Sequence, residues 1–174
     1  MLEKIFSKRN LLLLSIIVVA AFTRLIPHYP NFTAIGAVAL FGGAYFHKKY
    51  LSFAVPFIAL FITDLIIGFH ATMWAVYVSF AIIVMIGFSL RGQFKIAKLG
   101  LSVVSASVLF FIITNFAAWL SSPFYPQTFV GLIESYVAAI PFFQYNLLGD
   151  LFFGGIIFGI YEFAKLKYPS LIEA

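Results

Sequence analysis

The sequence predicts an all-α integral membrane protein, a single domain over residues 1–174 that forms a six-helix bundle with both ends in the cytoplasm. Three observations support this prediction. Of the 174 residues, 63% are hydrophobic and only 10% are charged, and the mean hydropathy is +1.07. A water-soluble domain needs more polar surface than this composition provides. The apolar residues form six runs, and short basic clusters separate them.

Each apolar run approaches the roughly 20 residues that a helix needs to cross the hydrocarbon layer. The second run is short, so we expect it either to tilt little or to begin in irregular backbone that protein covers. The long outer connection 121–145 contains the apolar stretch 129–140, which is expected to form an interfacial helix or lid. Asn146 is expected to cap the sixth helix. The predicted spans are 11–27, 32–46, 51–69, 73–90, 99–120 and 147–166.

The distribution of positive charge predicts the orientation. In this topology ten of the 11 Lys and Arg residues lie on one side, and Arg24 lies on the other. Because positive loops stay in the cytoplasm, both termini are predicted to be cytoplasmic in a multi-pass protein of the cell (inner) membrane. The first run has the basic start of a signal peptide but lacks a small-residue cleavage pattern, so we interpret it as a span. The net charge of +5 therefore indicates the lipid bilayer as partner, and no nucleic acid.

Several kinds of catalytic chemistry find no support in the sequence. There is no cysteine, which excludes thiolate catalysis and cysteine metal sites. The three histidines show no HxxxH or HxxE spacing, and no P-loop is present. We therefore expect a non-enzymatic protein without a cofactor. If a metal binds, His70 is the only plausible ligand.

Polar residues within the predicted spans share one depth. Arg24, Asp64, Asn115 and Asp150 all lie within roughly 8 Å of the outer boundary, at a rise of about 1.5 Å per residue. A charged side chain inside a span costs about 2.5–3.5 kcal/mol, so these groups should face protein or water. An apolar pocket with a few convergent polar groups is the usual form of a small-molecule site. Helical spacing and the turn at 68–72 add His28, His70, Trp74, Tyr77, Trp119 and Asn146 as candidate substrate-binding residues.

Each candidate also has a structural interpretation. Arg24 and Asp64 could form an ion pair that fixes helix packing. Trp74 and Trp119 fit the role of interfacial anchors at the lipid headgroups. His70 fits a solvated or capping role in its turn. The shared depth, rather than any one residue, favours a binding site.

A family resemblance rests on three motifs: a Gly-Gly turn after the second span, Asp64 near the end of the third, and Asn115 in the fifth. Segment 32–70 (FTAIGAVALFGGAYFHKKYLSFAVPFIALFITDLIIGFH) resembles the second and third helices of S components, the small substrate-binding membrane subunits of energy-coupling factor transporters. Segment 115–150 (NFAAWLSSPFYPQTFVGLIESYVAAIPFFQYNLLGD) resembles their fifth helix, outer loop and sixth helix. The likeness extends from about residue 24 to 159, and it is greatest to an uncharacterised six-span bacterial family of proposed transport proteins.

The resemblance implies an S-component-like fold with a vitamin-sized pocket that opens outward, beneath the loop between the first two helices. It also implies a partner, an energy-coupling transmembrane subunit with ATPases. The alanine-xxx-alanine pattern that S components carry on the first helix is absent, which leaves this partnership open. By position, the resemblance implies Asp64, His70, Asn115, Trp119 and Asn146 as pocket residues, with Asn31 and Thr33 near the lid.

Two functions are therefore considered. The first is a membrane-embedded solute-binding or transport subunit that takes up a vitamin-like small molecule from the outer face. The alternative is a structural or accessory subunit of a larger membrane complex, without transport of a small molecule. In that case the polar residues serve helix packing alone.

Overall fold

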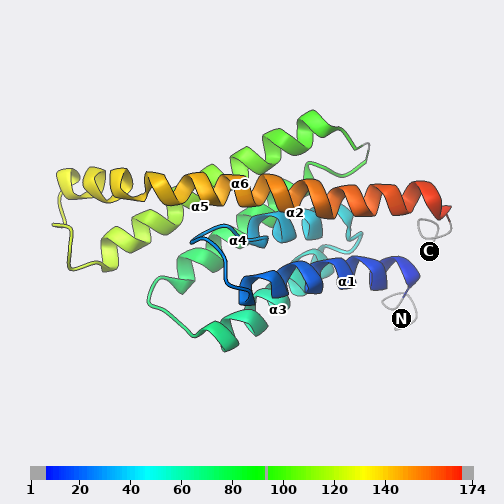
Figure 1. Cartoon of the computed structure of the whole chain (residues 1–174), viewed down its shortest axis with the longest axis horizontal. Helices are drawn as coiled ribbons and strands as arrows, with labels where there is room; N and C mark the ends of the chain where they lie inside the picture. Colours follow the sequence, from blue (N-terminus) through cyan, green and yellow to red (C-terminus); the bar gives the residue numbers. More distant parts are fainter. Residues whose placement is uncertain (1–6, 93, 170–174) are drawn as a thin grey trace.

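The computed structural model describes residues 7–92 and 94–169, which form six α-helices and one 3₁₀ turn (Figure 1). Lys4, one of the basic residues in the predicted orientation, lies outside the described residues. The predicted all-α class is confirmed, and α3, α4 and α5 begin and end within three residues of their predicted bounds. The elements are α1 (Lys8–Phe22), η1 (Thr23–Leu25), α2 (Ile35–Tyr45), α3 (Lys49–Ile67), α4 (Met73–Phe88), α5 (Ile96–Ser121) and α6 (Phe129–Lys167).

Three of these helices are long and apolar enough to cross a membrane. Within the described residues they are α3, α5 and α6. Helices α2 and α4 are also apolar but shorter. Length and composition therefore identify three candidate spans, fewer than the six that the sequence predicts.

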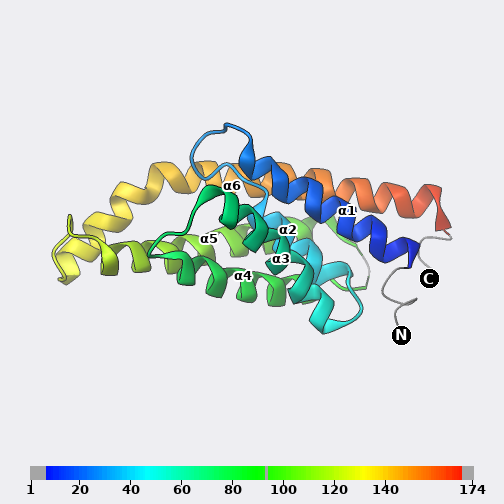
Figure 2. The ribbon, with the colours of Figure 1, turned by 90° about the horizontal axis from the view of Figure 1, so that it is seen from below.

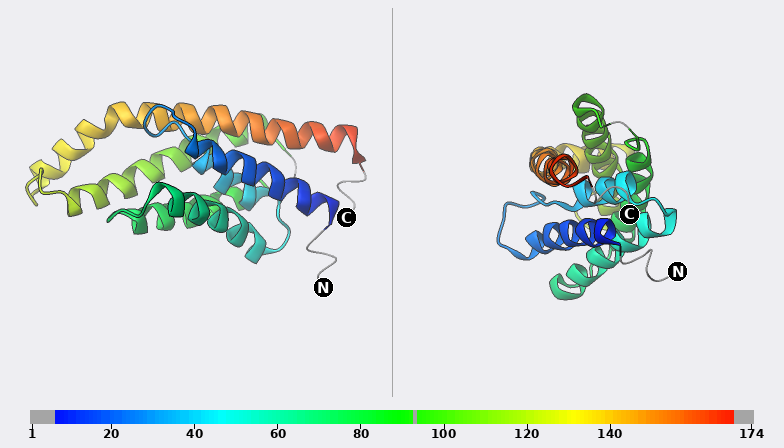
Figure 3. Two further views of the ribbon diagram at one scale, coloured as in Figure 1. Left: turned by 60° about the horizontal axis from the view of Figure 1, so that its bottom comes forward. Right: turned by 90° about the vertical axis from the view of Figure 1, so that its right-hand side faces the viewer.

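Helix α2 is the central element of the bundle. Ten of its 11 residues, from Ile35 to Ala44, are buried. It packs against each of the other five α-helices, which surround it in the end-on view of Figure 3. Such a helix, apolar on all sides, needs its whole surface covered. At about 1.5 Å per residue it is about 16 Å long, roughly half the thickness of a bilayer core.

The chain that enters α2 is irregular. Helix α1 ends at Phe22, tightens into η1, and residues 26–34 follow without regular structure. Asn31 has a positive φ of 65° within this segment. The first predicted helix, 11–27, is therefore too long at its C-terminal end. The second begins three residues later than predicted, and irregular backbone precedes it, which was one of the two alternatives expected for the short run.

Glycines let α2 and α4 approach each other closely. A Cβ atom on Gly43 would collide with the carbonyl oxygen of Val84, and one on Gly87 with that of Leu40. The two helices thus meet backbone to backbone. Residues 42 and 43 lie inside α2, so the predicted Gly-Gly turn is wrong: these glycines serve helix packing and do not turn the chain.

Two arginines close the C-terminal end of α2. Arg9, in the first turn of α1, donates a hydrogen bond to the carbonyl oxygen of Tyr45. Arg91 donates to the carbonyl oxygens of Gly43 (3.0 Å) and Phe46 (2.9 Å). The last carbonyls of a helix lack partners within the helix, and positive charge is favourable at that end. The arginines therefore donate hydrogen bonds to the last carbonyl groups of α2 and place positive charge at the negative end of its dipole.

Helix α6 differs most from the prediction. It has 39 residues, about 58 Å, and continues through Pro141. The predicted outer loop 121–145 is therefore irregular only at 122–128, and Asn146 lies inside the helix instead of capping it. Proline removes one helical hydrogen bond, but packing on α5 holds the helix on the N-terminal side of it, where the Tyr136 hydroxyl donates to the carbonyl oxygen of Ile112 (2.6 Å). The α5–α6 hairpin projects beyond the other helices at the left of Figures 1 and 2.

The contact between α2 and α4 can be tested with two alanine substitutions. We expect Gly43→Ala to lower the free energy of unfolding by about 1–3 kcal/mol, because the methyl group would force the helices apart. Gly159→Ala is the matched control, since a Cβ there meets no atom within 4 Å and alanine favours helix. Thermal unfolding of the detergent-solubilised protein, followed by far-UV circular dichroism, measures both. Equal melting temperatures would show that the helices are not in backbone contact.

Candidate functional site

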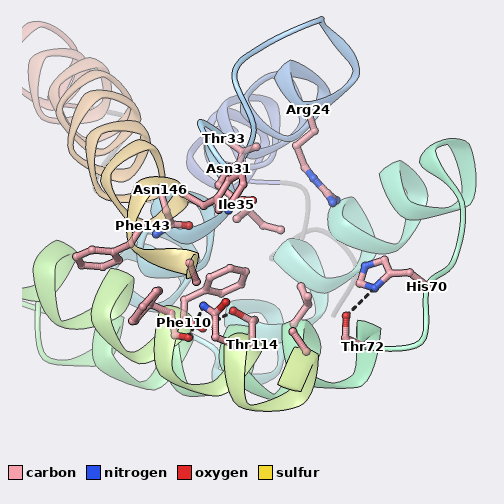
Figure 4. A pocket seen from close by; sticks show the side chains of 16 residues that line it. Arg24, Asn31, Thr33, Ile35, His70, Thr72, Phe110, Thr114, Phe143 and Asn146 are labelled. Atoms are coloured by element: carbon pink, nitrogen blue, oxygen red, sulfur yellow. Dashed lines mark hydrogen bonds between the residues drawn. The ribbon is translucent and has the colours of Figure 1, made fainter. Parts of the chain in front are cut away.

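A cavity of about 340 Å³ lies above the N-terminal end of α2, where the 26–34 segment and the α3–α4 turn meet α5 and α6 (Figure 4). Its volume falls within the roughly 300–1,000 Å³ of small-molecule sites. It extends from the exposed residues Asn31 and His70 to the buried Asn146. The lining residues are Arg24, Asn31, Thr33, Ile35, His70, Thr72, Val76, Phe110, Phe111, Thr114, Asn115, Ala118, Ala139, Phe142, Phe143 and Asn146.

The cavity has an aromatic wall and several neutral polar groups. Phenylalanines 110 and 111 from α5 and 142 and 143 from α6 form the wall, and the rings of Phe111 and Phe143 lie 4.9 Å apart. The polar groups are carboxamides, hydroxyls and the ring of His70. Among the described residues that line the cavity, Arg24 is the one with a permanent charge. The arrangement suits a ligand with a flat apolar part and hydrogen-bonding groups at its edge.

The charge of Arg24 is neutralised where it stands. Its Nη1 atom donates to Asp64 Oδ1 (2.8 Å) and to Thr63 Oγ1 (2.6 Å). The Tyr77 hydroxyl donates to the other oxygen of Asp64 (3.0 Å). The side chains of Arg24 and Asp64 are only 15% and 7% exposed. This network joins η1 to α3 and α4 and leaves the cavity edge close to electrically neutral.

Two residues of α5 present polar atoms at fixed positions. The Asn115 Nδ2 atom donates to the carbonyl oxygen of Phe111 (2.8 Å), so its Oδ1 atom is left as an acceptor. Thr114 Oγ1 donates to the carbonyl oxygen of Phe110 (2.7 Å). Such bonds to the preceding turn hold the side chain in one rotamer. Asn115 therefore offers a ligand a carboxamide oxygen that is already oriented.

His70 lies in the α3–α4 turn, on the side of the cavity opposite Asn146 and Phe143 in Figure 4. Its Nδ1 atom is hydrogen-bonded to Thr72 Oγ1 (3.1 Å), which leaves Nε2 for a ligand. In the part of the chain that the structure describes, no three His, Cys, Asp or Glu side chains are grouped to hold a metal ion. His70 therefore offers one ring nitrogen as a hydrogen-bonding group at the edge of the cavity.

Asp150 forms the floor beneath Asn146. Its Oδ2 atom accepts hydrogen bonds from Ser107 Oγ (2.7 Å) and Asn146 Nδ2 (3.1 Å). The backbone amides of Gly36 and Ala37 also donate to its carboxylate. With 2% of its surface exposed, Asp150 is inaccessible to a ligand. Four donors from three helices thus converge on one carboxylate.

These contacts make Asp150 the N-terminal cap of α2. The residue at the usual capping position, Ala34, has no side chain that can accept a bond. Asp150 replaces it from a different helix, where negative charge is favourable. A Cβ atom at position 36 would collide with the carboxylate of Asp150, so glycine is the residue that fits there. The cavity therefore rests on the capped end of α2, with Asn146 as the link between them.

The structure brings five of the predicted site residues to the cavity: Arg24, Asn31, His70, Asn115 and Asn146. Three more, Asp64, Tyr77 and Asp150, lie behind this lining. Asp64 and Asp150 accept hydrogen bonds from the lining residues Arg24 and Asn146, and Tyr77 donates to Asp64. These three position the lining residues and do not face the cavity.

The other three predicted residues lie elsewhere. His28 is exposed in the 26–34 segment, where its ring bonds the carbonyl oxygen of Ile26, because α1 ends before it and no helical face joins it to Arg24. Trp74 is 49% exposed on the outer face of α4. Trp119 lines a smaller neighbouring cavity of about 240 Å³, and its Nε1 atom donates to the carbonyl oxygen of Pro126 (3.0 Å).

The aromatic wall was missed from the sequence. The chain has 23 phenylalanines, so no single one stands out. Helical spacing was the available signal: Phe111 precedes Asn115 by four residues, and Phe142 precedes Asn146 by four. Each carboxamide therefore has a phenylalanine on its own helical face.

The comparisons with known proteins identify the family alone. The chain belongs to DUF6580, a family of unknown function, which matches residues 4–171. No curated protein and no solved structure matches it.

The capping role of Asp150 is tested by Asp150→Asn. The new amide would point a donor at groups that all donate, so we expect the free energy of unfolding to fall by roughly 2–3 kcal/mol. Glu134→Gln is the matched control, because Glu134 is exposed on the same helix. Thermal unfolding in detergent compares the two. A melting temperature of Asp150→Asn equal to that of the control would contradict the role.

Proposed function

We propose that this member of the DUF6580 family is a membrane-embedded solute-binding protein that takes up a vitamin-like small molecule from the outer face of the cell membrane. The observation that carries the proposal is the cavity of about 340 Å³, in which neutral hydrogen-bonding groups face an aromatic wall. The substrate class is a small, uncharged or zwitterionic molecule with a planar ring.

The chemistry of the lining favours that substrate class. The positive charge of Arg24 is paired with Asp64, and the positive end of the α2 dipole is already occupied by Asp150. An anionic ligand would find no free positive group, and a cation no free carboxylate, among the described lining residues. Asn115 Oδ1 and His70 Nε2 remain to bind ligand donors or acceptors, and a planar ring could stack on the phenylalanines.

Exposed apolar side chains support a membrane location. Soluble proteins rarely expose large contiguous apolar patches. Here α3, α5 and α6 each carry a row of large exposed apolar residues. These are Ile58, Phe61, Ile62, Leu65, Ile66 and Ile67 on α3, Leu101, Val104, Val108, Ile112, Phe116 and Leu120 on α5, and Leu148, Leu151, Phe152, Ile156, Ile160 and Phe163 on α6.

The proposal includes six crossings with cytoplasmic ends. Beyond the three candidate spans, α1 together with η1 forms one crossing and α4 forms another. Residues 26–45 form the remaining crossing, as irregular backbone followed by α2. Irregular backbone is tolerated at membrane depth where protein covers it. Arg9, Arg91 and Lys165 gather at the C-terminal end of α2, opposite the cavity. Since positive residues stay inside, this end is assigned to the cytoplasm and the cavity to the outer leaflet.

The S-component resemblance supports a transporter in which this chain binds the ligand and other subunits supply the energy. The chain carries no P-loop, so uptake driven by ATP hydrolysis would require ATPases on other subunits. A membrane coupling subunit with ATPases is the partner proposed on that resemblance. The binding step itself needs only this chain.

Ligand-induced stabilisation tests the proposal. A panel of neutral and zwitterionic vitamins is added to the purified protein, and one class is expected to raise the melting temperature. Asn115→Ala should weaken binding of that ligand about tenfold or more, since it removes an oriented acceptor. Gln144→Ala is the control, because Gln144 is exposed on α6 and does not line the cavity. Isothermal titration calorimetry gives both affinities.

The alternative function predicts a different result. If no compound stabilises the protein and it copurifies with fixed membrane partners, the accessory-subunit interpretation replaces the transport proposal. Equal affinities of Asn115→Ala and Gln144→Ala would remove the cavity assignment even if a ligand binds.

A further inference from the structure

A second cavity, about 350 Å³, lies at the other end of α2, where α1 begins and α6 ends. It shares no lining residue with the cavity described above. Its walls combine three permanent positive charges with two tyrosines and a histidine. The residues are Arg9, Tyr45, His47, Arg91, Tyr161 and Lys165, together with Ala44, Phe46, Leu90 and Gly92.

Both guanidinium groups are held rigidly and keep one nitrogen unused. Arg9 donates from Nε to the Tyr161 hydroxyl (3.1 Å) and from Nη2 to the carbonyl oxygen of Tyr45. Arg91 uses Nε for Gly43, and Nη2 for Phe46 and Ser52. Neither Nη1 atom bonds to any other residue that the structure describes. Among the described residues, every buried side-chain nitrogen or oxygen has a hydrogen-bond partner. Because the two Nη1 atoms have none, they are not buried and remain accessible to a ligand.

Two of the three positive charges that line this cavity, those of Arg9 and Arg91, have no neutralising carboxylate among the described residues, whereas Lys165 is paired with Glu162. Within residues 7–92 and 94–169, the ion pairs are Arg24 with Asp64 and Lys165 with Glu162, so Arg9 and Arg91 have no carboxylate partner. Arg9 is nevertheless only 6% exposed. The pKa of His47 is lowered, first by the charge of Arg9, then by burial and then by the charge of Arg91. The charges of the buried Arg9 and the partly buried Arg91 therefore both act on His47, at the same side of the cavity.

We propose that this cavity binds a phosphate group, carried by an anionic phospholipid headgroup or by a soluble phosphate. Rigid guanidinium groups with free N–H donors match the geometry of phosphate oxygens. The Tyr161 hydroxyl accepts from Arg9, so its own proton is free to donate to the anion. Basic pockets between helices on the cytoplasmic side are suited to anionic headgroups.

A bound phosphate would stabilise the whole bundle. The two arginines that would contact it also close the C-terminal end of α2. An anion between them offsets their mutual repulsion and strengthens that closure. The inference does not depend on the outer cavity or on its ligand.

The experiment uses the full chain, purified in a neutral detergent and stripped of lipid. Inorganic phosphate is compared with chloride at equal ionic strength, and phosphatidylglycerol with phosphatidylcholine in nanodiscs. We expect the phosphate-bearing anion to raise the melting temperature by about 3 °C or more. Stabilisation by both probes indicates a general phosphate site, and stabilisation by phosphatidylglycerol alone indicates a lipid headgroup site. No shift with either probe overturns the inference.

Two lysine variants locate the effect. Lys165→Gln removes a charge that lines the cavity but leaves both arginines and the cap of α2 in place. Lys167→Gln makes the same change in the last turn of the same helix, outside the cavity. The anion-induced shift should fall by half or more in Lys165→Gln and persist in Lys167→Gln. Equal shifts would place the anion elsewhere.

The outer cavity provides an independent control. Asn115→Ala should keep the full anion-induced shift, because Asn115 lies at the opposite end of the bundle. A failure of the vitamin panel would leave this result unchanged. Loss of the anion-induced shift in Asn115→Ala would contradict a site at the Arg9 end.

Discussion

The structure depends on the closure of a short buried helix at both ends. Ten of the 11 residues of helix α2 are buried, and a buried terminal amide or carbonyl without a hydrogen-bond partner would cost several kcal/mol. Asp150 accepts from the first amides, and Arg9 and Arg91 donate to the last carbonyls. These three side chains come from α6, α1 and the segment after α4. Closing α2 therefore fixes the surrounding elements relative to one another.

The same constraint accounts for the cavity. Because α2 has only 11 residues, it begins partway along the bundle, and the irregular segment 26–34 leads to it. A full-length helix would fill the space above Gly36, whereas the irregular chain leaves room between α5, α6 and the α3–α4 turn. Interrupted helices are a common origin of binding sites in membrane transporters. Asn146 contacts both the cavity and Asp150, so a ligand held by Asn146 would also steady the capped end of α2.

Structural features that depend on composition and helical periodicity could be predicted from the sequence. Features that depend on tertiary contacts could not. Apolar runs predicted α3 to α5 closely. Arg24 and Asn115, two of the polar residues predicted to share one depth, line the same cavity. The start of α6 was misplaced because Pro141 is a helix breaker in isolation, while packing against α5 outweighs the one bond that it removes. The role of Asp150 was hidden for the same reason. A cap supplied from another helix leaves no local pattern.

The arginines at the two ends of α2 differ in whether a carboxylate neutralises their charge. This difference decides which ligands each cavity can bind. Arg24 donates to a carboxylate, so the pair is neutral and its cavity suits a neutral ligand. Arg9 and Arg91 donate to carbonyl and hydroxyl oxygens, which are dipoles and cannot cancel a full charge. Each of these arginines therefore keeps both an unpaired Nη1 atom and a charge that no carboxylate among the described residues neutralises. One bundle thereby combines a neutral polar cavity at the amino end of α2 with an anion-attracting cavity at its carboxyl end.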